Sequence, residues 1–144
     1  MIKRINIIAL FVSIALFIFS LTQDAYCTTN LCRSSIDAFL TGIVGMMYGG
    51  AAITWLANPI LITSWIFIKR NTKLSMILSV ASVIISLSFL FFKGVVDNEA
   101  GHVNLIIRYK FGYWLWLSST IVIMIGNLTL YFESIRLSKG PIEN

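Results

Sequence analysis

Charged side chains are scarce in this chain, and their scarcity excludes an ordinary soluble domain. They make up 12% of the 144 residues, whereas soluble domains carry about 25%. Hydrophobic residues make up 58% of the sequence, which is more apolar surface than one soluble core of this length can bury. We therefore expect lipid to surround most of the chain. The length leaves no room for a separate catalytic domain.

No Asp, Glu, Lys, Arg or His lies inside any of the four long apolar segments. Ionisable groups inside a membrane normally mark ion pathways and proton relays, so their absence counts against proton-coupled antiport. The small multidrug transporters also have four short helices, but they use a carboxylate in the first span, and the first apolar segment here has none. Since each segment is long enough to cross a bilayer, we expect spans at about residues 5–22, 42–68, 74–92 and 111–132.

Groups of catalytic or metal-binding residues are also missing. The single histidine, His102, has only Asp97 and Glu99 near it in the sequence, and one solvated histidine does not make a metal site. The sequence contains no phosphate-binding loop, no Ser/His/Asp set and no pair of catalytic carboxylates. It therefore predicts a non-enzymatic protein with no catalytic residue, no metal site and no cofactor.

Only two cysteines occur, Cys27 and Cys32, and both lie between the first and second apolar segments. Outside the cytoplasm oxidation is the default, and the spacing permits a small closed loop. We expect a structural disulfide, with a redox role as the alternative. The quinone-linked membrane proteins that make disulfides are also four-helix bundles, but they use two cysteine pairs, one of them C-x-x-C. This chain has a single C-x-x-x-x-C pair.

The basic residues predict how the chain is oriented, because cytoplasmic loops carry an excess of Lys and Arg. The basic start and first apolar segment also fit a cleaved signal peptide, but no clean small-x-small site follows, so we expect a retained span. Both termini are then expected in the cytoplasm. The inner side would hold Lys3, Arg4, Lys69, Arg70, Lys73, Arg136 and Lys139, and the outer side Arg33, Lys93, Arg108 and Lys110.

The segment 42–68 is longer than a bilayer requires. As a helix it would extend roughly 40 Å, whereas the hydrocarbon core is about 30 Å thick, so it must tilt, kink or project. Pro59 favours a kink, because it donates no hydrogen bond and crowds the carbonyl group of Trp55. Asn58 is an amide near the middle of the span and needs a partner. We expect a helix kink at Trp55, Asn58 and Pro59, which is either a binding site or a satisfied structural feature.

Small and polar residues recur at helical spacing along every apolar segment. Lipid supplies no hydrophobic drive for helix association, so close packing and interhelical hydrogen bonds must hold the helices together. We expect these residues on the inward faces of a bundle, and a polar pathway is the alternative. They are Asn6, Ser13 and Ser20 in the first segment, Gly45 and Gly49 in the second, Ser75, Ser79, Ser82 and Ser86 in the third, and Gly112, Ser119, Gly126 and Asn127 in the fourth.

The loops on the predicted outer side carry local structural signals. Ser34 followed three residues later by Asp37 is typical of a helix start. Polar and apolar residues alternate over 102–111, which indicates a strand, and Val95-Val96 would pair with it across a turn at 97–101. We expect a small extracytoplasmic cap, which would contain a short β-hairpin. A loop lying in the membrane interface is the alternative.

Two stretches resemble parts of small, poorly characterised four-span bacterial inner-membrane proteins. They are Trp55-Leu56-Ala57-Asn58-Pro59 in the second segment and Gly112-Tyr113-Trp114-Leu115-Trp116 in the fourth. In size, and in its Ile-, Asn-, Lys- and Ser-rich style, the chain also resembles the membrane immunity proteins that are made beside pore-forming toxins. The resemblance implies a bacterial inner membrane and transfers no catalytic residue.

The sequence thus predicts an all-α membrane protein, an antiparallel bundle of four transmembrane helices with a small cap. We expect a non-enzymatic protein that binds a membrane-inserting partner such as a toxin. A small oligomeric transporter or channel with Asn58 at its site is the first alternative, and an extracytoplasmic thiol–disulfide protein is the second. The net charge of +5 fits basic cytoplasmic loops rather than nucleic-acid binding, so the expected partners are the lipid bilayer and a membrane protein.

Overall fold

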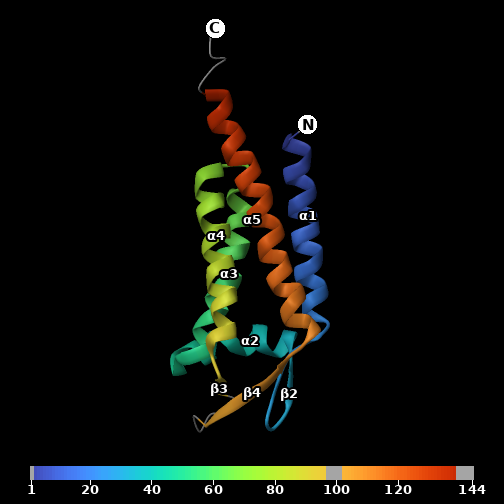
Figure 1. Cartoon of the computed structure of the whole chain (residues 1–144), viewed down its shortest axis with the longest axis vertical. Coiled ribbons are helices and arrows are strands. Elements are labelled where there is room, and N and C mark those ends of the chain that lie inside the picture. The colour runs from blue at the N-terminus through green and yellow to red at the C-terminus, as the bar shows by residue number, and fades with distance from the viewer. Residues whose placement is uncertain (1, 97–101, 139–144) are drawn as a thin grey trace.

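The computed structural model describes residues 2–96 and 102–138, which form a bundle of long helices with a small sheet at one end (Figure 1). Ile2 and Ser138 both lie at the end opposite the sheet (Figure 1). α2 (Ser35–Gly45) lies across the sheet end of the bundle. The helices that run along the bundle are α1 (Ile2–Leu21), α3 (Ala57–Phe67), α4 (Thr72–Ser88) and α5 (Phe111–Ser138).

Three helical runs in the described part of the chain are long and apolar enough to cross a membrane: Gly50–Phe67, Thr72–Phe91 and Phe111–Ser138. They correspond to three of the four predicted spans, so the mainly helical fold is confirmed. The first predicted span is also helical, as α1. The part of α1 whose side chains are described, Asn6–Leu21, falls short of that length.

Polar and apolar side chains are distributed in the opposite way to those of a soluble protein. Large apolar groups point outward, with Phe11 67% exposed and Ile84 63% exposed. The interior holds many hydroxyl and amide groups beside its apolar clusters. This arrangement suits lipid, because outward groups then meet acyl chains and inward groups hydrogen-bond between helices. The fully buried serines among the described residues are Ser13, Ser20, Ser64, Ser75, Ser79, Ser82, Ser86 and Ser119.

The predicted continuous span over residues 42–68 is wrong, because the chain turns within it. After α2 comes a short 3₁₀-helix, η1 (Met46–Tyr48), and then the turn. Gly49 and Gly50 have φ angles of +74° and +61°, a left-handed conformation that favours glycine. A second 3₁₀-helix, η2 (Gly50–Leu56), then leads directly into α3.

Pro59 does not interrupt the helix, and the predicted kink at this residue stays a prediction. It is the third residue of α3, and the helical run Gly50–Phe67 passes through it. The 3₁₀ winding of η2 changes to α winding just before this proline, and a proline is well tolerated in the first turn of an α-helix because its missing N–H is not needed there. The glycine pair therefore marks the turn in this segment.

The predicted hairpin is confirmed. β3 (Gly94–Val96) pairs antiparallel with β4 (Val103–Tyr109), with Val95 opposite Asn104. The predicted turn at residues 97–101 lies outside the described residues. The hairpin is half of a four-stranded sheet in the order β2-β1-β4-β3, and the other half was not predicted.

The other half of the sheet carries the disulfide. β1 (Asp24–Thr28) pairs antiparallel with both β4 and β2 (Cys32–Ser34). The disulfide joins Cys27 and Cys32, which lie opposite each other on β1 and β2. α2 begins directly after β2, where the Ser34 hydroxyl oxygen accepts a hydrogen bond from the Asp37 N–H at 3.2 Å. The predicted disulfide and the predicted helix start are both confirmed.

Candidate functional site

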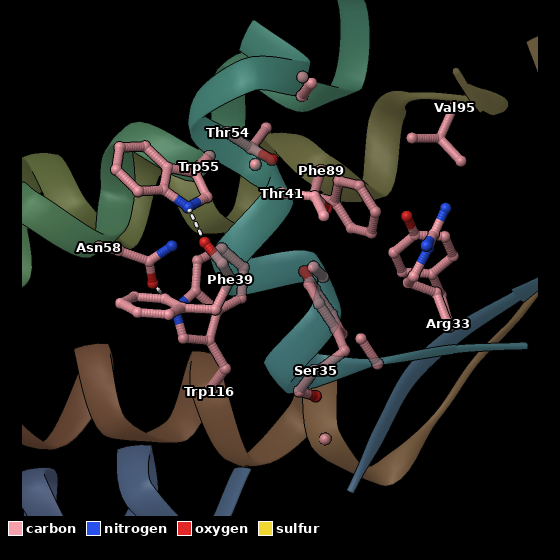
Figure 2. Close-up of a pocket in the computed structure, with 18 of the residues that line it drawn as sticks. Arg33, Ser35, Phe39, Thr41, Thr54, Trp55, Asn58, Phe89, Val95 and Trp116 are labelled. Carbon is pink, nitrogen blue, oxygen red and sulfur yellow. Dashed lines mark hydrogen bonds between the residues drawn. The ribbon is translucent and has the colours of Figure 1, made fainter. Parts of the chain in front are cut away.

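A cavity of about 140 Å³ lies between the sheet and the adjoining helix ends. Its walls come from α2, η2, the last turn of α1 and the first turns of α3 and α5 (Figure 2). Aromatic rings make much of the wall, and several polar groups lie between them. The aromatic residues labelled in Figure 2 are Phe39, Trp55, Phe89 and Trp116, and the polar ones are Arg33, Ser35, Thr41, Thr54 and Asn58.

A side-chain hydrogen bond of Trp55 joins η2 to α2 at one side of the cavity. Its indole N–H donates to the carbonyl oxygen of Phe39 at 2.7 Å (Figure 2). The ring packs so closely on α2 that a Cβ atom added at Gly42 would collide with it. The predicted role of Trp55 in a helix kink is therefore replaced by a contact between two helices that the glycine turn folds together.

Asn58 joins α3 to α5. The indole N–H of Trp116 donates to the Asn58 amide oxygen at 2.8 Å, and Asn58 is buried. Figure 2 shows Asn58 between the rings of Trp55 and Trp116. Because both indole N–H groups already have partners within the protein, the two rings offer fixed apolar faces to whatever enters the cavity.

Ser35 adds a polar group without a partner to the cavity wall. Its hydroxyl is buried and makes no hydrogen bond within the described part of the chain. Buried hydroxyl groups normally find a partner. Ser35 packs against Gly112, where an added Cβ would also lie 2.6 Å from the carbonyl oxygen of Asp24. The first turn of α5 is therefore pressed against the start of α2 and the sheet.

Aromatic rings connect the cavity to the sheet. The centroid of the Phe89 ring lies 5.5 Å from the ring centroid of Tyr26, 5.7 Å from that of Tyr109 and 5.6 Å from that of Tyr113. Burial raises the pKa of the Tyr109 phenol above its ordinary value. This aromatic cluster supports the sheet side of the cavity.

A buried hydrogen-bonded clamp holds three helices together in the middle of the bundle. The hydroxyls of Ser64 and Ser75 each donate to the other residue's carbonyl oxygen, at 2.9 and 2.8 Å. The amide N–H₂ of Asn127 donates to the Ser64 hydroxyl and the Ser75 carbonyl, both at 3.1 Å. Ser64 was not predicted as a packing residue, although it follows Gly50 and Ala57 at the same seven-residue spacing that marks the first and fourth segments.

Other predicted packing residues are also buried, some between α3, α4 and α5 and some between α1 and α5. Ser82 donates to the Ala57 carbonyl at 3.0 Å, and the Ser86 and Thr120 hydroxyls lie 3.3 Å apart. Ser79 and Ser119 donate to carbonyl groups of their own helices. Gly126 packs so tightly that an added Cβ would lie 2.7 Å from the Cβ of Ala9.

The predicted small-residue pair Gly45 and Gly49 does not form one packing face. A Cβ at Gly45 would lie 3.3 Å from the Cβ of Ala52, so this glycine does face another helix. Gly49 has open space around its Cβ position and serves the turn instead. Small residues at helix-packing positions and glycines at turns look alike in a sequence, and here one pair contains both.

Both cysteines are bonded to each other, and no group of three His, Cys, Asp or Glu side chains gathers in residues 2–96 and 102–138. Asp97 and Glu99, named with His102 as possible ligands, lie outside that part. Comparison of the chain with protein-family models, curated proteins and solved structures finds no match.

Proposed function

We propose that the protein is a non-enzymatic membrane protein that binds one large apolar side chain of a membrane-inserting partner in the cavity beneath the sheet. The observation that carries the proposal is the cavity itself, with the fixed rings of Trp55 and Trp116 in its wall. Engineered cavities of about 150 Å³ hold a molecule the size of benzene. The cavity volume of about 140 Å³ therefore matches one aromatic side chain.

The distribution of side chains supports a membrane location with four crossings. α1 would make the first crossing, and the three membrane-length helices the others. Four crossings agree with Ile2 and Ser138 at the same end. The excess of basic residues at that end favours a cytoplasmic location for it. The sheet and its disulfide are then extracytoplasmic, where disulfides persist, and a bacterial inner membrane fits the resemblance noted in the sequence.

An apolar anchor in a closed pocket is a common way to bind a protein partner. Binding energy concentrates where an aromatic side chain fills a desolvated pocket with a polar rim. The polar residues Arg33, Ser35 and Thr41 contribute to this wall. A toxin helix that inserts into the same membrane would present such an anchor, and capture would prevent it from forming a pore. This is the activity of an immunity protein.

The test introduces a photo-crosslinking amino acid at Ala38, which lines the cavity, and at Leu40, which is 63% exposed on the same helix. In native membranes we expect a membrane-inserting partner to crosslink from position 38 and not from position 40. Ala38→Phe, which fills the cavity, should abolish protection against that partner, and Leu40→Phe should preserve it. Equal protection by the two correctly inserted variants would contradict the proposal.

A small oligomeric transporter or channel remains the second candidate, because a second cavity opens at the opposite end of the bundle. Flux of a solute through liposomes that contain the purified protein would favour it. A thiol–disulfide function predicts instead that Cys27→Ser with Cys32→Ser abolishes activity. Full protection by the double variant would exclude a thiol–disulfide function.

A further inference from the structure

A groove of about 710 Å³ opens at the end of the bundle opposite the sheet. It lies between α1, α5 and the turn that joins α3 to α4. One part of its wall is apolar, formed by residues such as Ile7, Leu10 and Leu130. Polar and charged side chains make the other part: Asn6, Lys69, Thr72, Glu133 and Ser134.

Two acceptor oxygens in this wall have no partner among the described residues. They are the amide oxygen of Asn6 and one carboxylate oxygen, Oε2, of Glu133, and both atoms are buried. Asn6 itself is 6% exposed. A buried acceptor without a donor is costly, and both orphan atoms require the same kind of partner. A ligand that satisfies them must donate N–H or O–H groups, and a positive charge would match the carboxylate.

The groove also contains a positive charge. Lys69 lines it and begins the basic turn Lys69-Arg70-Asn71-Thr72-Lys73. The Oε2 atom of Glu133 accepts no hydrogen bond from Lys69. Because the groove holds a positive and a negative side chain, it matches a ligand that has both a phosphate group and a positively charged hydrogen-bond donor. The phosphate would bind Lys69 and the donor would bind Glu133.

We propose that this groove binds a phospholipid with a primary ammonium headgroup, such as phosphatidylethanolamine. The ammonium group donates to Glu133 and Asn6, the phosphate lies at Lys69, and an acyl chain follows the apolar wall along Ile7 and Leu130. Choline carries the charge but has no N–H donor, and a glycerol headgroup has no positive charge. The inference rests on the membrane location and is independent of the partner-binding cavity at the other end.

The test uses the purified full chain in nanodiscs that contain phosphatidylethanolamine, phosphatidylcholine or phosphatidylglycerol, with retained lipid identified by native mass spectrometry. We expect wild-type protein to retain phosphatidylethanolamine about tenfold better than phosphatidylcholine, the effect of one charge-assisted hydrogen bond. Equal retention of the three lipids by the wild type would overturn the proposal, and this readout needs no variant.

Glu133→Gln should remove the preference for phosphatidylethanolamine over phosphatidylcholine. Asp24→Asn, which loses the same charge at the exposed start of β1, should keep it. Lys69→Gln should weaken the binding of all three phospholipids to the same extent, because each of them carries a phosphate group. An unchanged preference in folded Glu133→Gln protein would also overturn the proposal. Crosslinking from position 38 tests the other cavity separately, so either proposal can fail while the other stands.

Discussion

The two ends of the bundle are built differently, although the same long helices reach both. At the sheet end, the transverse helix α2, parts of the sheet and the adjoining helix ends line a cavity of about 140 Å³ with aromatic walls. At the other end, one short turn between α3 and α4 borders an open groove with charged residues in its wall. The first is suited to recognition by shape and the second to recognition by charge. The difference teaches that the structure added to the long helices, namely the sheet, the disulfide and α2, lies at the end with the aromatic cavity.

The middle of the bundle separates the two ends. Leu61 and Ile123 are fully buried there, and the clamp of Ser64, Ser75 and Asn127 crosses three helices. A disturbance at one end should therefore have little effect at the other. The following predictions break or sharpen that separation.

The largest effect is expected from Gly112→Ala at the sheet end. The new Cβ would lie 2.6 Å from the Asp24 carbonyl oxygen, and backbone cannot move aside as a side-chain tip can. Overpacking of this kind costs about 1–3 kcal/mol, and we expect the upper part of that range in reversible unfolding from detergent micelles. The matched control is Gly45→Ala, where the new Cβ would lie 3.3 Å from its nearest neighbour, the Cβ of Ala52. A greater loss in the control would contradict the prediction.

Removal of the disulfide should have the next largest effect. The loop between Cys27 and Cys32 is short, so the chain-entropy model gives about 2 kcal/mol. Cys27→Ser with Cys32→Ser should lower the free energy of unfolding by about that amount and loosen the sheet end. Lipid preference at the opposite groove, measured in the same nanodiscs, should not change. A lost lipid preference would show that the two ends are coupled.

Asn127→Ala should have the smallest effect of the three, in the middle of the bundle. It removes the two hydrogen bonds to Ser64 and Ser75 but also removes an amide oxygen that has no partner within the described residues. Interhelical hydrogen bonds in membranes average about 0.6 kcal/mol, so we expect a loss near 1 kcal/mol. Thr129→Ala, on the exposed side of α5, is the control. A loss above about 3 kcal/mol would mean that the clamp holds the bundle together.

Features that depend on local sequence could be predicted. The alternation over 102–111 predicted β4, the Ser34 and Asp37 pair predicted the start of α2, and the cysteine spacing predicted the disulfide. The polar residues at helical spacing also mark positions that the structure buries, such as Ser82 and Ser86. Each of these patterns depends on residues within one segment, so it can be recognised in a single sequence.

Features that join distant segments could not be predicted. The pairing of β1 with β4 brings together residues such as Cys27 and Arg108. No local sequence pattern predicts this pairing. The turn at Gly49 and Gly50 lies in an uninterrupted apolar run, where a glycine pair reads equally well as helix packing. The cavity combines Phe39, Trp55 and Trp116 from three helices, and their contact depends on that turn. The candidate site therefore required the fold, even though Trp55 and Asn58 were identified beforehand.

The pairing of α1 with α5 has a consequence for how the protein is made. α1 packs chiefly against α5, and the Ser13 hydroxyl donates to the Ser119 carbonyl oxygen across 106 residues of chain. A ribosome adds roughly 5–20 residues per second, so the first helix waits about 5–20 s before its main partner exists. During that interval Ser13 and Asn6 face lipid or a membrane insertase. The helix that is made last thus completes the burial of the helix that was made first.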